Sequence, residues 1–374
     1  MFKKKIYKAF IFITITVFIF LFLDFIFGKL VFNKFIRKNF KDADTTFGIK
    51  HPVYHHTVKE NYRTFSTGSG NIRHSFCSDK FGFRISCKKN NVTSKNIDIA
   101  FIGDSQTAGF NLDYEDTFVF LFNKNFKDLK ISNLALPSYS PAIYYAKINY
   151  LIKNNFKFKE IIVFLDLSDI HDDNVRYYLK DDIVKEKDIN FRKENYSQVD
   201  KTFFFLERKL KLTTSLIILV DDFLIKQNFK KKRIPDWVDN NPRSGWTYNY
   251  EQYKKKFYNN IELNEAIQTS IINMNKLYEL LKKNNIKLSI AVYPWPETLK
   301  NDVHENIQKK IWEEFCKSKC EKFINLMDIF FEQKKIIGYH ETYLKFFIYG
   351  DIHINKNSHK LIASQLISIY KKSY

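Results

Sequence analysis

A serine, a histidine and an aspartate stand in two short motifs far apart in the chain, and together they could perform nucleophilic chemistry. Ser105 lies in Gly103-Asp104-Ser105-Gln106-Thr107-Ala108-Gly109, directly after a short apolar run that reads as a buried strand. Asp351 and His353 lie in Gly350-Asp351-Ile352-His353, just before a helix-like segment. A serine hydroxyl needs a base to remove its proton, and the base needs a group that orients it. These three residues therefore form the minimum set for acyl transfer.

The choice of base needs support, because the chain has nine histidines. His353 is favoured because it stands in an Asp-x-His context before a helix, downstream of the serine motif. His171, flanked by Asp172 and Asp173, is the main alternative, either as the base or as part of a weak metal site. We expect His353 to be the base and Asp351 to hold its imidazole.

These motifs resemble the SGNH, or GDSL-type, hydrolase family over roughly residues 97–170 and 285–372. The serine motif matches the first block of the family, and Asp351-Ile352-His353 resembles the last. The one-residue gap in Asp-x-His is closer to the membrane-associated sugar O-acetyltransferase branch, such as the alginate acetylation proteins, than to the soluble esterases. The second and third blocks have degraded counterparts in Asn133-Leu134-Ala135-Leu136-Pro137-Ser138-Tyr139-Ser140-Pro141 and Leu165-Asp166-Leu167-Ser168-Asp169.

The resemblance implies three donors to the oxyanion that forms during acyl transfer. These are the backbone N–H of Ser105, the backbone N–H of Ser138 and the side chain of Ser168. Ser138 stands where the family has glycine, and a backbone donor survives this change if the backbone angles suit serine. Ser168 stands where the family usually has asparagine; its hydroxyl is a shorter donor than an amide, and a strand-end cap without a catalytic role is an equal alternative.

Three further residues are candidates for substrate binding. Asp104 and Asp169 belong to the first and third blocks of the resemblance. Trp295, in Tyr293-Pro294-Trp295-Pro296, follows a predicted strand near the same rim, where an aromatic ring could stack on a sugar. The alternative is that this proline-rich segment only shapes the loop.

The alternation of apolar segments predicts the fold. Strands are expected at 97–103, 129–134, 160–166, 287–293 and 322–326, and helices at 117–126, 141–154, 263–284, 303–316 and 356–370. Such alternation indicates a doubly wound α/β fold with a parallel sheet, and the resemblance implies a flavodoxin-like fold. Ligands bind at the carboxyl ends of the strands in these sheets, where Ser105, Ser138 and Ser168 are expected.

The chain divides into an N-terminal apolar segment, an intermediate segment and the α/β domain. Residues 1–32 have a basic start and an apolar run at 9–27 interrupted by Asp24, which predicts an uncleaved transmembrane anchor rather than a removed signal peptide. Residues 33–95 read as a small irregular β-containing segment beside the α/β domain at 96–374. An insertion at about 172–260 is expected to form a helical lid or flank; a surface for substrate or lipid is the alternative.

The charge and the motifs of the chain restrict the partners and cofactors that it could bind. The 374-residue chain has a formal net charge of +20, but its lysines are spread throughout and no nucleic-acid-binding motif occurs, so no nucleic-acid partner is expected. No cofactor or metal is expected, because no dinucleotide, phosphate-loop or metal-ligand pattern is present.

The four cysteines form two near pairs, Cys77 with Cys87 and Cys316 with Cys320. In an exported protein they predict two disulfides; four thiols in a cytosolic protein are the alternative.

Three functional hypotheses follow. The first is a serine-dependent acyl-ester hydrolase, anchored in the inner membrane with its catalytic domain periplasmic or extracellular, that acts on an acylated glycan or another acylated envelope molecule. The second is an O-acetyltransferase of a cell-surface polysaccharide that uses the same serine and works with a membrane acyltransferase as partner. The third is a catalytically weak envelope binding protein that retains the fold.

Overall fold

The computed structural model describes residues 2–31, 48–67, 73–88, 94–187, 233–241, 243–255, 261–302 and 306–371, with a few single residues between 210 and 257. The chain falls into two units. One comprises residues 1–43 and 192–233, and the other comprises residues 44–191 and 234–374.

The first unit contains the helix α1 (Phe2–Val31). Its segment Lys5–Ile26 is the one stretch among the described residues that is long and apolar enough to cross a membrane, by length and composition. Asp24, which interrupts this apolar run, is buried. Its Oδ2 accepts hydrogen bonds of 2.6 Å from both the backbone N–H and the hydroxyl of Thr213. The carboxylate is thus satisfied by a partner far along the chain. Most of the expected apolar helix at 203–223 lies outside the described residues.

The second unit is built on an eight-stranded sheet in the order β12-β11-β8-β6-β7-β5-β4-β3. Its strands are β3 (Arg63–Thr67), β4 (Arg73–Ser78), β5 (Arg84–Ile85), β6 (Asn96–Ile102), β7 (Ile131–Asn133), β8 (Lys157–Leu165), β11 (Lys287–Val292) and β12 (Lys322–Asn325). Strands β6, β7, β8, β11 and β12 are mutually parallel. At one edge of the sheet, β5 pairs antiparallel with β7, β4 with β5, and β3 with β4.

The order of the parallel strands confirms the predicted fold class. In chain order β6, β7, β8, β11 and β12 are first to fifth, and in the sheet they stand in the order 2-1-3-4-5. This is the flavodoxin-like, doubly wound arrangement, in which the chain reverses direction beside its first strand. The carboxyl ends of β6 and β8 border this switch point, so groups that follow them face the place where such folds bind ligands.

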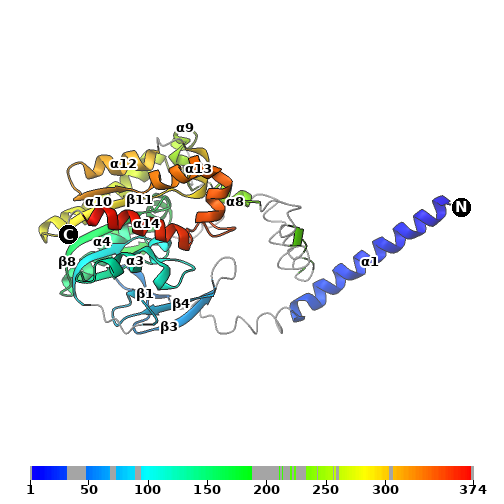
Figure 1. The fold of residues 1–374 in the computed structure, drawn as a ribbon, viewed down its shortest axis with the longest axis horizontal. Coiled ribbons are helices and arrows are strands. Elements are labelled where there is room, and N and C mark those ends of the chain that lie inside the picture. Colours follow the sequence, from blue (N-terminus) through cyan, green and yellow to red (C-terminus); the bar gives the residue numbers. More distant parts are fainter. Residues whose placement is uncertain are drawn as a thin grey trace. The chain divides into compact units, whose positions relative to one another are not determined.

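Helices cover the sheet (Figure 1), and its central strands are buried. α3 packs with α14, and the ring of Phe118 on α3 stacks on Phe164 of β8. α4 and α5 pack with α10. The helices of this unit are α2 (Ser105–Ala108), α3 (Phe118–Asn125), α4 (Pro141–Lys153), α5 (Asp169–Val175), α8 (Asp236–Asp239), α9 (Tyr250–Lys254), α10 (Leu263–Lys283), α11 (Pro296–Asn301), α12 (Ile307–Cys316), α13 (Met327–Phe346) and α14 (Lys356–Tyr370), with 3-10 turns η4 (Tyr114–Asp116) and η6 (Gly245–Thr247).

Two small hairpins accompany the main sheet. β1 (Gly48–His51) pairs with β2 (His55–Val58), and β9 (Tyr177–Lys180) pairs with β10 (Ile183–Glu186). The segment at 33–95 was expected beside the α/β domain; its strands β3 to β5 continue the central sheet, through the pairing of Arg84 with Asn133. Of the expected insertion, the described parts include both β9–β10 and α8 to α9.

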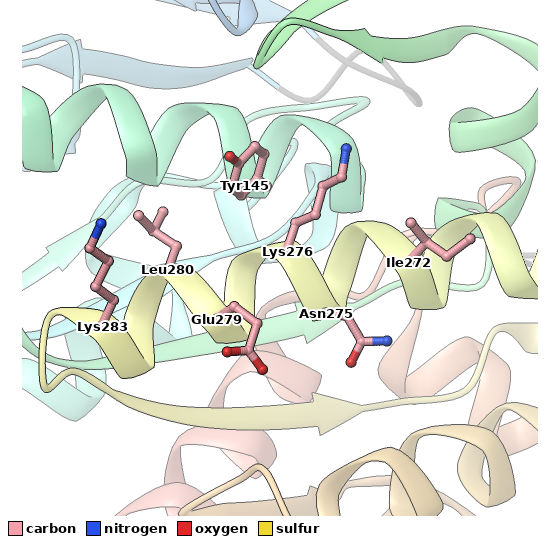
Figure 2. Close-up of a pocket in the computed structure, with 7 residues that line it drawn as sticks. All are labelled: Tyr145, Ile272, Asn275, Lys276, Glu279, Leu280 and Lys283. Atoms are coloured by element: carbon pink, nitrogen blue, oxygen red, sulfur yellow. The ribbon is translucent and has the colours of Figure 1, made fainter.

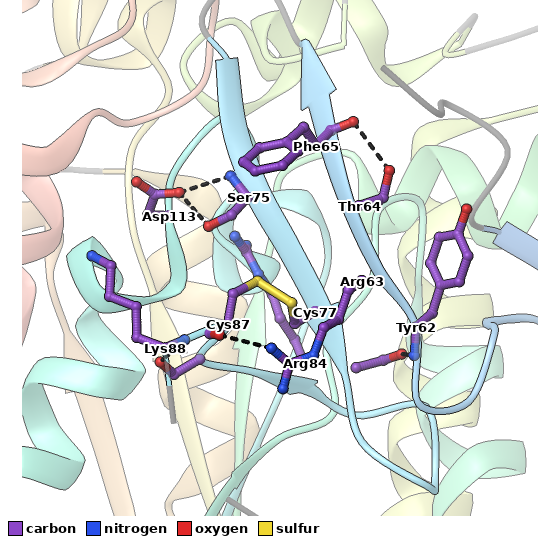
Figure 3. The surroundings of a disulfide bond; sticks show 12 residues. Tyr62, Arg63, Thr64, Phe65, Ser75, Cys77, Arg84, Cys87, Lys88 and Asp113 are labelled. Atoms are coloured by element: carbon purple, nitrogen blue, oxygen red, sulfur yellow. Dashed lines mark hydrogen bonds between the residues drawn. A yellow bond between two sulfur atoms is a disulfide. The ribbon is translucent and has the colours of Figure 1, made fainter. Parts of the chain in front are cut away.

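Both predicted disulfides are present, Cys77 with Cys87 and Cys316 with Cys320. The first ties β4 to the segment after β5, as Figure 3 shows.

The predicted strands and helices of the α/β domain all have counterparts within a few residues, apart from 303–305 of the expected helix at 303–316, which lie outside the described residues. The 20-residue helix α13 has no counterpart in the expectations. It carries Gly338 in its middle with a non-helical φ of 78°, which interrupts the helical pattern in the sequence.

Candidate active site

The nucleophile turn follows the carboxyl end of β6. Asp104 caps the short helix α2, its Oδ1 accepting a 2.9 Å hydrogen bond from the N–H of Gln106. The turn needs both of its glycines. A Cβ on Gly103 would lie 2.4 Å from the hydroxyl oxygen of Thr107, and Gly109 has a φ of 75°, which favours glycine. The serine is thereby placed at the first position of a helix, at the rim of the sheet.

The structure brings Ser105, His353 and Asp351 together from positions 248 residues apart in the chain. The Nε2 atom of His353 lies 2.8 Å from the Oγ of Ser105, and its Nδ1 lies 2.7 Å from the Oδ1 of Asp351. An ionised carboxylate only accepts hydrogen bonds, so Nδ1 carries a proton. In the neutral ring Nε2 is then free to accept the proton of Ser105. This is the arrangement of a nucleophile, its base and the group that orients the base.

Two opposing influences act on the pKa of His353. Burial lowers it, but the hydrogen bond and charge of Asp351, helped by the charges of Asp104 and Asp166, outweigh burial and raise the pKa above its ordinary value of 6.5. An imidazole of raised pKa is a stronger base for the serine proton. The charged form that follows proton transfer is stabilised by the same carboxylates.

Asp104 is the second neighbour of the Ser105 hydroxyl. Its Oδ2 lies 3.1 Å from Oγ, so the single hydroxyl proton has two possible acceptors. Burial and the charge of Asp166 raise the pKa of Asp104 to about 8. The expected contact of Asp104 with substrate is replaced here by contacts with its own turn.

Asp166, directly after β8, is the centre of a buried hydrogen-bond network. Its Oδ1 accepts from the N–H of Ser168 at 2.8 Å and from the hydroxyl of Ser168 at 2.6 Å. Its Oδ2 accepts from the hydroxyl of Tyr293 at 2.7 Å and from the indole N–H of Trp295 at 2.8 Å. These four donors satisfy the hydrogen-bonding capacity of the buried carboxylate.

This network corrects two expectations from the sequence. The one proton of the Ser168 hydroxyl is directed to Asp166, so the structure does not place it for donation to an oxyanion. Trp295 is only 2% exposed, and its ring is enclosed in the core. It is therefore not available to stack on a sugar. The alternative interpretation of this segment, as a group that shapes the loop, fits its position.

Asp169 is likewise a buried support rather than a group that faces substrate. It is 1% exposed, and it accepts hydrogen bonds from the hydroxyl of Tyr144 at 3.0 Å and from the N–H of Asp166 at 3.1 Å. Burial, reinforced by the charges of Asp166 and Asp104, raises its pKa well above the ordinary value. The expected role of Asp169 in substrate binding is thus not supported.

Ser138 lies in a tight turn after β7. The N–H of Tyr139 donates to the carbonyl of Leu136 at 3.2 Å, and Ser138 has a φ of 64°, in the left-handed region. Within the described part of the chain, the N–H groups of Ser138 and Ser105 donate to no other protein group. Both remain available as donors, as the sequence interpretation of an oxyanion site requires.

Two residues that the sequence interpretation missed brace the loop of His353. The side-chain amide of Gln106 accepts from the N–H of Ile354 at 2.9 Å and donates to the carbonyl of Ile352 at 3.3 Å, on either side of His353. The hydroxyl of Tyr343 accepts from the N–H of Gly350 at 2.8 Å. The only signal for Gln106 was its position beside the nucleophile, and Tyr343 lies in the helix that was not predicted.

Arg84 is a third missed residue, and it holds the segment that follows the nucleophile helix. Its buried guanidinium donates to the carbonyls of Gly109 at 2.7 Å, Ala108 and Leu112. Burial lowers its pKa to about 10. Figure 3 shows Arg84 beside the disulfide of Cys77 and Cys87. Strand β5, which carries Arg84 and lies beside the disulfide-bonded β4, thus supports the nucleophile turn.

The alternative histidine lies elsewhere. His171 is on α5, and its Nδ1 is 3.2 Å from the Oδ1 of Asp172. Across the described ranges, no three His, Cys, Asp or Glu side chains are grouped so that they could hold a metal ion. Away from the site, Figure 2 shows an open groove between α4 and α10. None of the candidate site residues lines it; the lining residues are Tyr145, Ile272, Asn275, Lys276, Glu279, Leu280 and Lys283.

Comparisons with known proteins find similar solved structures. No family model and no curated protein matches the chain. The chain is similar to a lipolytic G-D-S-L family protein from Veillonella parvula, with 11% identity and a TM-score of 0.41, covering 73% of this chain and 98% of that chain. It is similar to a catalytic mutant of the acetylxylan esterase Axe2 from Geobacillus stearothermophilus, with 9% identity and a TM-score of 0.40, covering 73% and 93%. It is also similar to the esterase EstA from Pseudoalteromonas sp., with 10% identity and a TM-score of 0.38, covering 75% and 98%.

Proposed function

We propose that this protein is a serine-dependent acyl-ester hydrolase with Ser105 as nucleophile, His353 as general base and acid, and Asp351 as the residue that orients His353. The observation that carries the proposal is the continuous contact from Ser105 Oγ to His353 Nε2 at 2.8 Å and from His353 Nδ1 to Asp351 at 2.7 Å. The position of Ser105 at the switch point of a doubly wound sheet supports the same conclusion.

The proposed reaction has two steps, acylation of Ser105 and hydrolysis of the acyl-serine. The Oγ of Ser105 attacks the ester carbonyl carbon while its proton passes to Nε2 of His353; the ester C–O bond then breaks, and the leaving alcohol takes that proton. In the second step a water molecule attacks the acyl-serine, gives its proton to His353, and the carboxylic acid leaves as the proton returns to Ser105. The N–H groups of Ser105 and Ser138 stabilise the negative oxygen in both steps.

We propose an acylated glycan or another acylated envelope molecule as substrate, and a periplasmic or extracellular location for the catalytic domain. The apolar segment Lys5–Ile26 of α1 supports an inner-membrane anchor at 1–32. The two disulfides support an oxidising compartment, because disulfides persist there and are rare in the cytosol. Transfer of the acyl group to a glycan hydroxyl instead of water is the second candidate, favoured by the Asp-x-His spacing. A membrane acyltransferase would then supply the acyl group.

The test compares the full chain with Ser105→Ala, both produced by an oxidising export route and purified in detergent. Each is incubated with an activated acetyl ester, and product release and intact mass are followed. The hydrolase predicts steady release that is lost in Ser105→Ala. A stable acetyl adduct on the unmodified chain alone supports the transferase. If product release and mass are the same in both proteins, Ser105 is not the nucleophile, and the envelope binding protein becomes the better interpretation.

The location has its own test. A reporter that is active only after export is fused to the C-terminus, and a second reporter that is active only in the cytoplasm is fused at the same point. Activity of the export reporter alone supports the proposed orientation. Activity of the cytoplasmic reporter alone excludes it.

A further inference from the structure

We propose that His56 is a positioning residue that holds the Pro137–Ser138 peptide in the orientation that presents the Ser138 N–H to the oxyanion. This inference rests on the proposed function, because it concerns a donor of the same site. His56 lies on β2, outside every motif that pointed to the chemistry, and 81 residues before Pro137.

The turn that contains Ser138 has two possible forms. The hydrogen bond from Tyr139 N–H to the Leu136 carbonyl closes a four-residue β-turn with Pro137 and Ser138 at its centre. The φ of 64° at Ser138 identifies a type II turn, since a type I turn has a negative φ there. The two types differ by a flip of the central peptide, which is the Pro137–Ser138 unit. A flip would turn the Ser138 N–H to the opposite side.

Serine at this position does not favour the observed form. A type II turn prefers glycine at its third residue, because a side chain makes the left-handed conformation unfavourable. Most residues, serine included, are compatible with the type I form. Something outside the turn must therefore stabilise the orientation that the structure has.

His56 supplies that contact. Its Nε2 lies 2.9 Å from the carbonyl oxygen of Pro137. This carbonyl and the Ser138 N–H belong to one trans peptide plane, so they point in opposite directions. A hydrogen bond to the carbonyl fixes the plane and also polarises it, which strengthens the N–H as a donor. The flipped form would lose this bond.

The protonation of His56 follows from its partners. A carbonyl only accepts, so Nε2 carries the proton. Burial lowers the pKa of His56 to about 4, so the ring is neutral near pH 7 and its Nδ1 accepts. The Nδ1 of His55 lies 2.8 Å from this atom and must donate to it. The Nε2 of His55 lies 3.6 Å from the carboxylate of Glu186 on β10, beyond hydrogen-bond distance.

The ring of His56 is held in place by its surroundings. The hydroxyl of Tyr139 donates to the backbone carbonyl of His56 at 2.8 Å, and the two rings are 4.8 Å apart, edge to face. The buried ammonium of Lys147 on α4 donates to the Leu134 carbonyl at 2.8 Å and to the Tyr139 hydroxyl at 3.2 Å. The β1–β2 hairpin thus docks on the turn through contacts on both sides of Ser138.

The first test compares two substitutions in the full chain. His56→Phe keeps a ring of similar size but loses the donor, whereas His56→Gln keeps an N–H donor. We expect His56→Phe to lower kcat for an activated acetyl ester about 10- to 100-fold with little change in KM, as for the loss of one oxyanion donor, and His56→Gln to recover most of the rate. An alkyl boronic acid, which mimics the tetrahedral intermediate, should bind His56→Phe more weakly by a similar factor. Thermal unfolding of each variant shows whether it is folded.

A double-mutant cycle makes the test specific to the turn. Ser138→Gly retains the N–H but removes the side chain that disfavours the type II form. We expect His56→Phe to cost at least about threefold less in kcat in the Ser138→Gly background than in the native one, because the residues act on one equilibrium. Equal losses in both backgrounds, or no loss from His56→Phe, would overturn the proposal.

The outcomes separate this inference from the proposed function. If Ser105→Ala abolishes turnover while His56→Phe has native kcat and boronate affinity, the hydrolase stands and the role of His56 is wrong. If Ser105→Ala has no effect, the proposed function itself fails. If His56→Phe does not fold, His56→Leu, which also lacks the donor, takes its place. A native rate in folded His56→Leu contradicts the proposal. A rate lowered to the extent expected for His56→Phe supports it.

Discussion

The candidate site has a triad side, formed by Ser105, His353 and Asp351, and a donor side, expected at Ser138 and Ser168. Both were predicted from short motifs, but their contacts in the structure agree with the predictions to different extents. On the triad side, Ser105, His353 and Asp351 make the contacts that their residue types suggest. On the donor side, the hydroxyl of Ser168 donates to Asp166, and the proposed donor Ser138 lies in a turn with a left-handed backbone conformation. Side-chain chemistry follows from residue type and order, whereas a backbone donor depends on conformation. Conformation is stabilised by residues that a motif does not include.

The largest expected effect tests the base on the triad side. His353→Gln removes the proton acceptor of Ser105, and we expect kcat/KM for an activated acetyl ester to fall about 10⁴-fold. His171→Gln is the matched control, because His171 was the alternative base, and we expect its rate to stay within about threefold of the native rate. Steady-state kinetics of both folded variants decide. A large loss in His171→Gln alone would reverse the assignment.

The second effect concerns the orienting carboxylate and has a pH signature. The base form of His353 is present above its pKa, so activity should fall as the pH drops through a value above 6.5. Asp351 raises that pKa, so Asp351→Asn should move the acidic limb to lower pH and lower the maximum rate about 10²- to 10⁴-fold. The measurement is kcat/KM from pH 4 to 9. A limb that stays in place would show that Asp351 does not set the pKa.

The comparison also explains how far the sequence could predict the molecule. The α/β strands were found because buried parallel strands are continuous apolar runs, and the triad because Ser105, Asp351 and His353 occur in specific motifs. Trp295 was expected near the rim because it follows a strand end, but it is buried, and its indole N–H donates to Asp166, 129 residues away. The brace by Gln106 and the contact of His56 with Pro137 are equally non-local. No local pattern encodes such contacts, so they required the fold.

A smaller effect is expected from the brace on the triad side. Gln106→Met keeps the length of the side chain but removes its hydrogen bonds to the loop of His353. We expect kcat to fall about tenfold, since misplacement of a catalytic group reduces the rate. The buried N–H of Ile354 would lose its partner, which lowers the free energy of unfolding by about 1–3 kcal/mol. Kinetics and chemical denaturation measure the two effects, and native values of both in Gln106→Met would contradict the role of this brace.

The smallest expected effect is on the donor side. Ser168→Ala removes a hydroxyl whose proton is already directed to Asp166, so we expect kcat to change by less than about threefold, far below the 10²-fold typical of an oxyanion donor. Asp166 keeps three other hydrogen bonds, from the Ser168 N–H, Tyr293 and Trp295, so the rest of its network remains in place. Steady-state kinetics of Ser168→Ala measure this change in kcat. Ser168→Asn, which introduces the residue of the family pattern, is measured beside it. A 30-fold loss in Ser168→Ala would mean that the hydroxyl turns from Asp166 to the oxyanion during the reaction, and the two sides of the site would then be alike in their use of side chains.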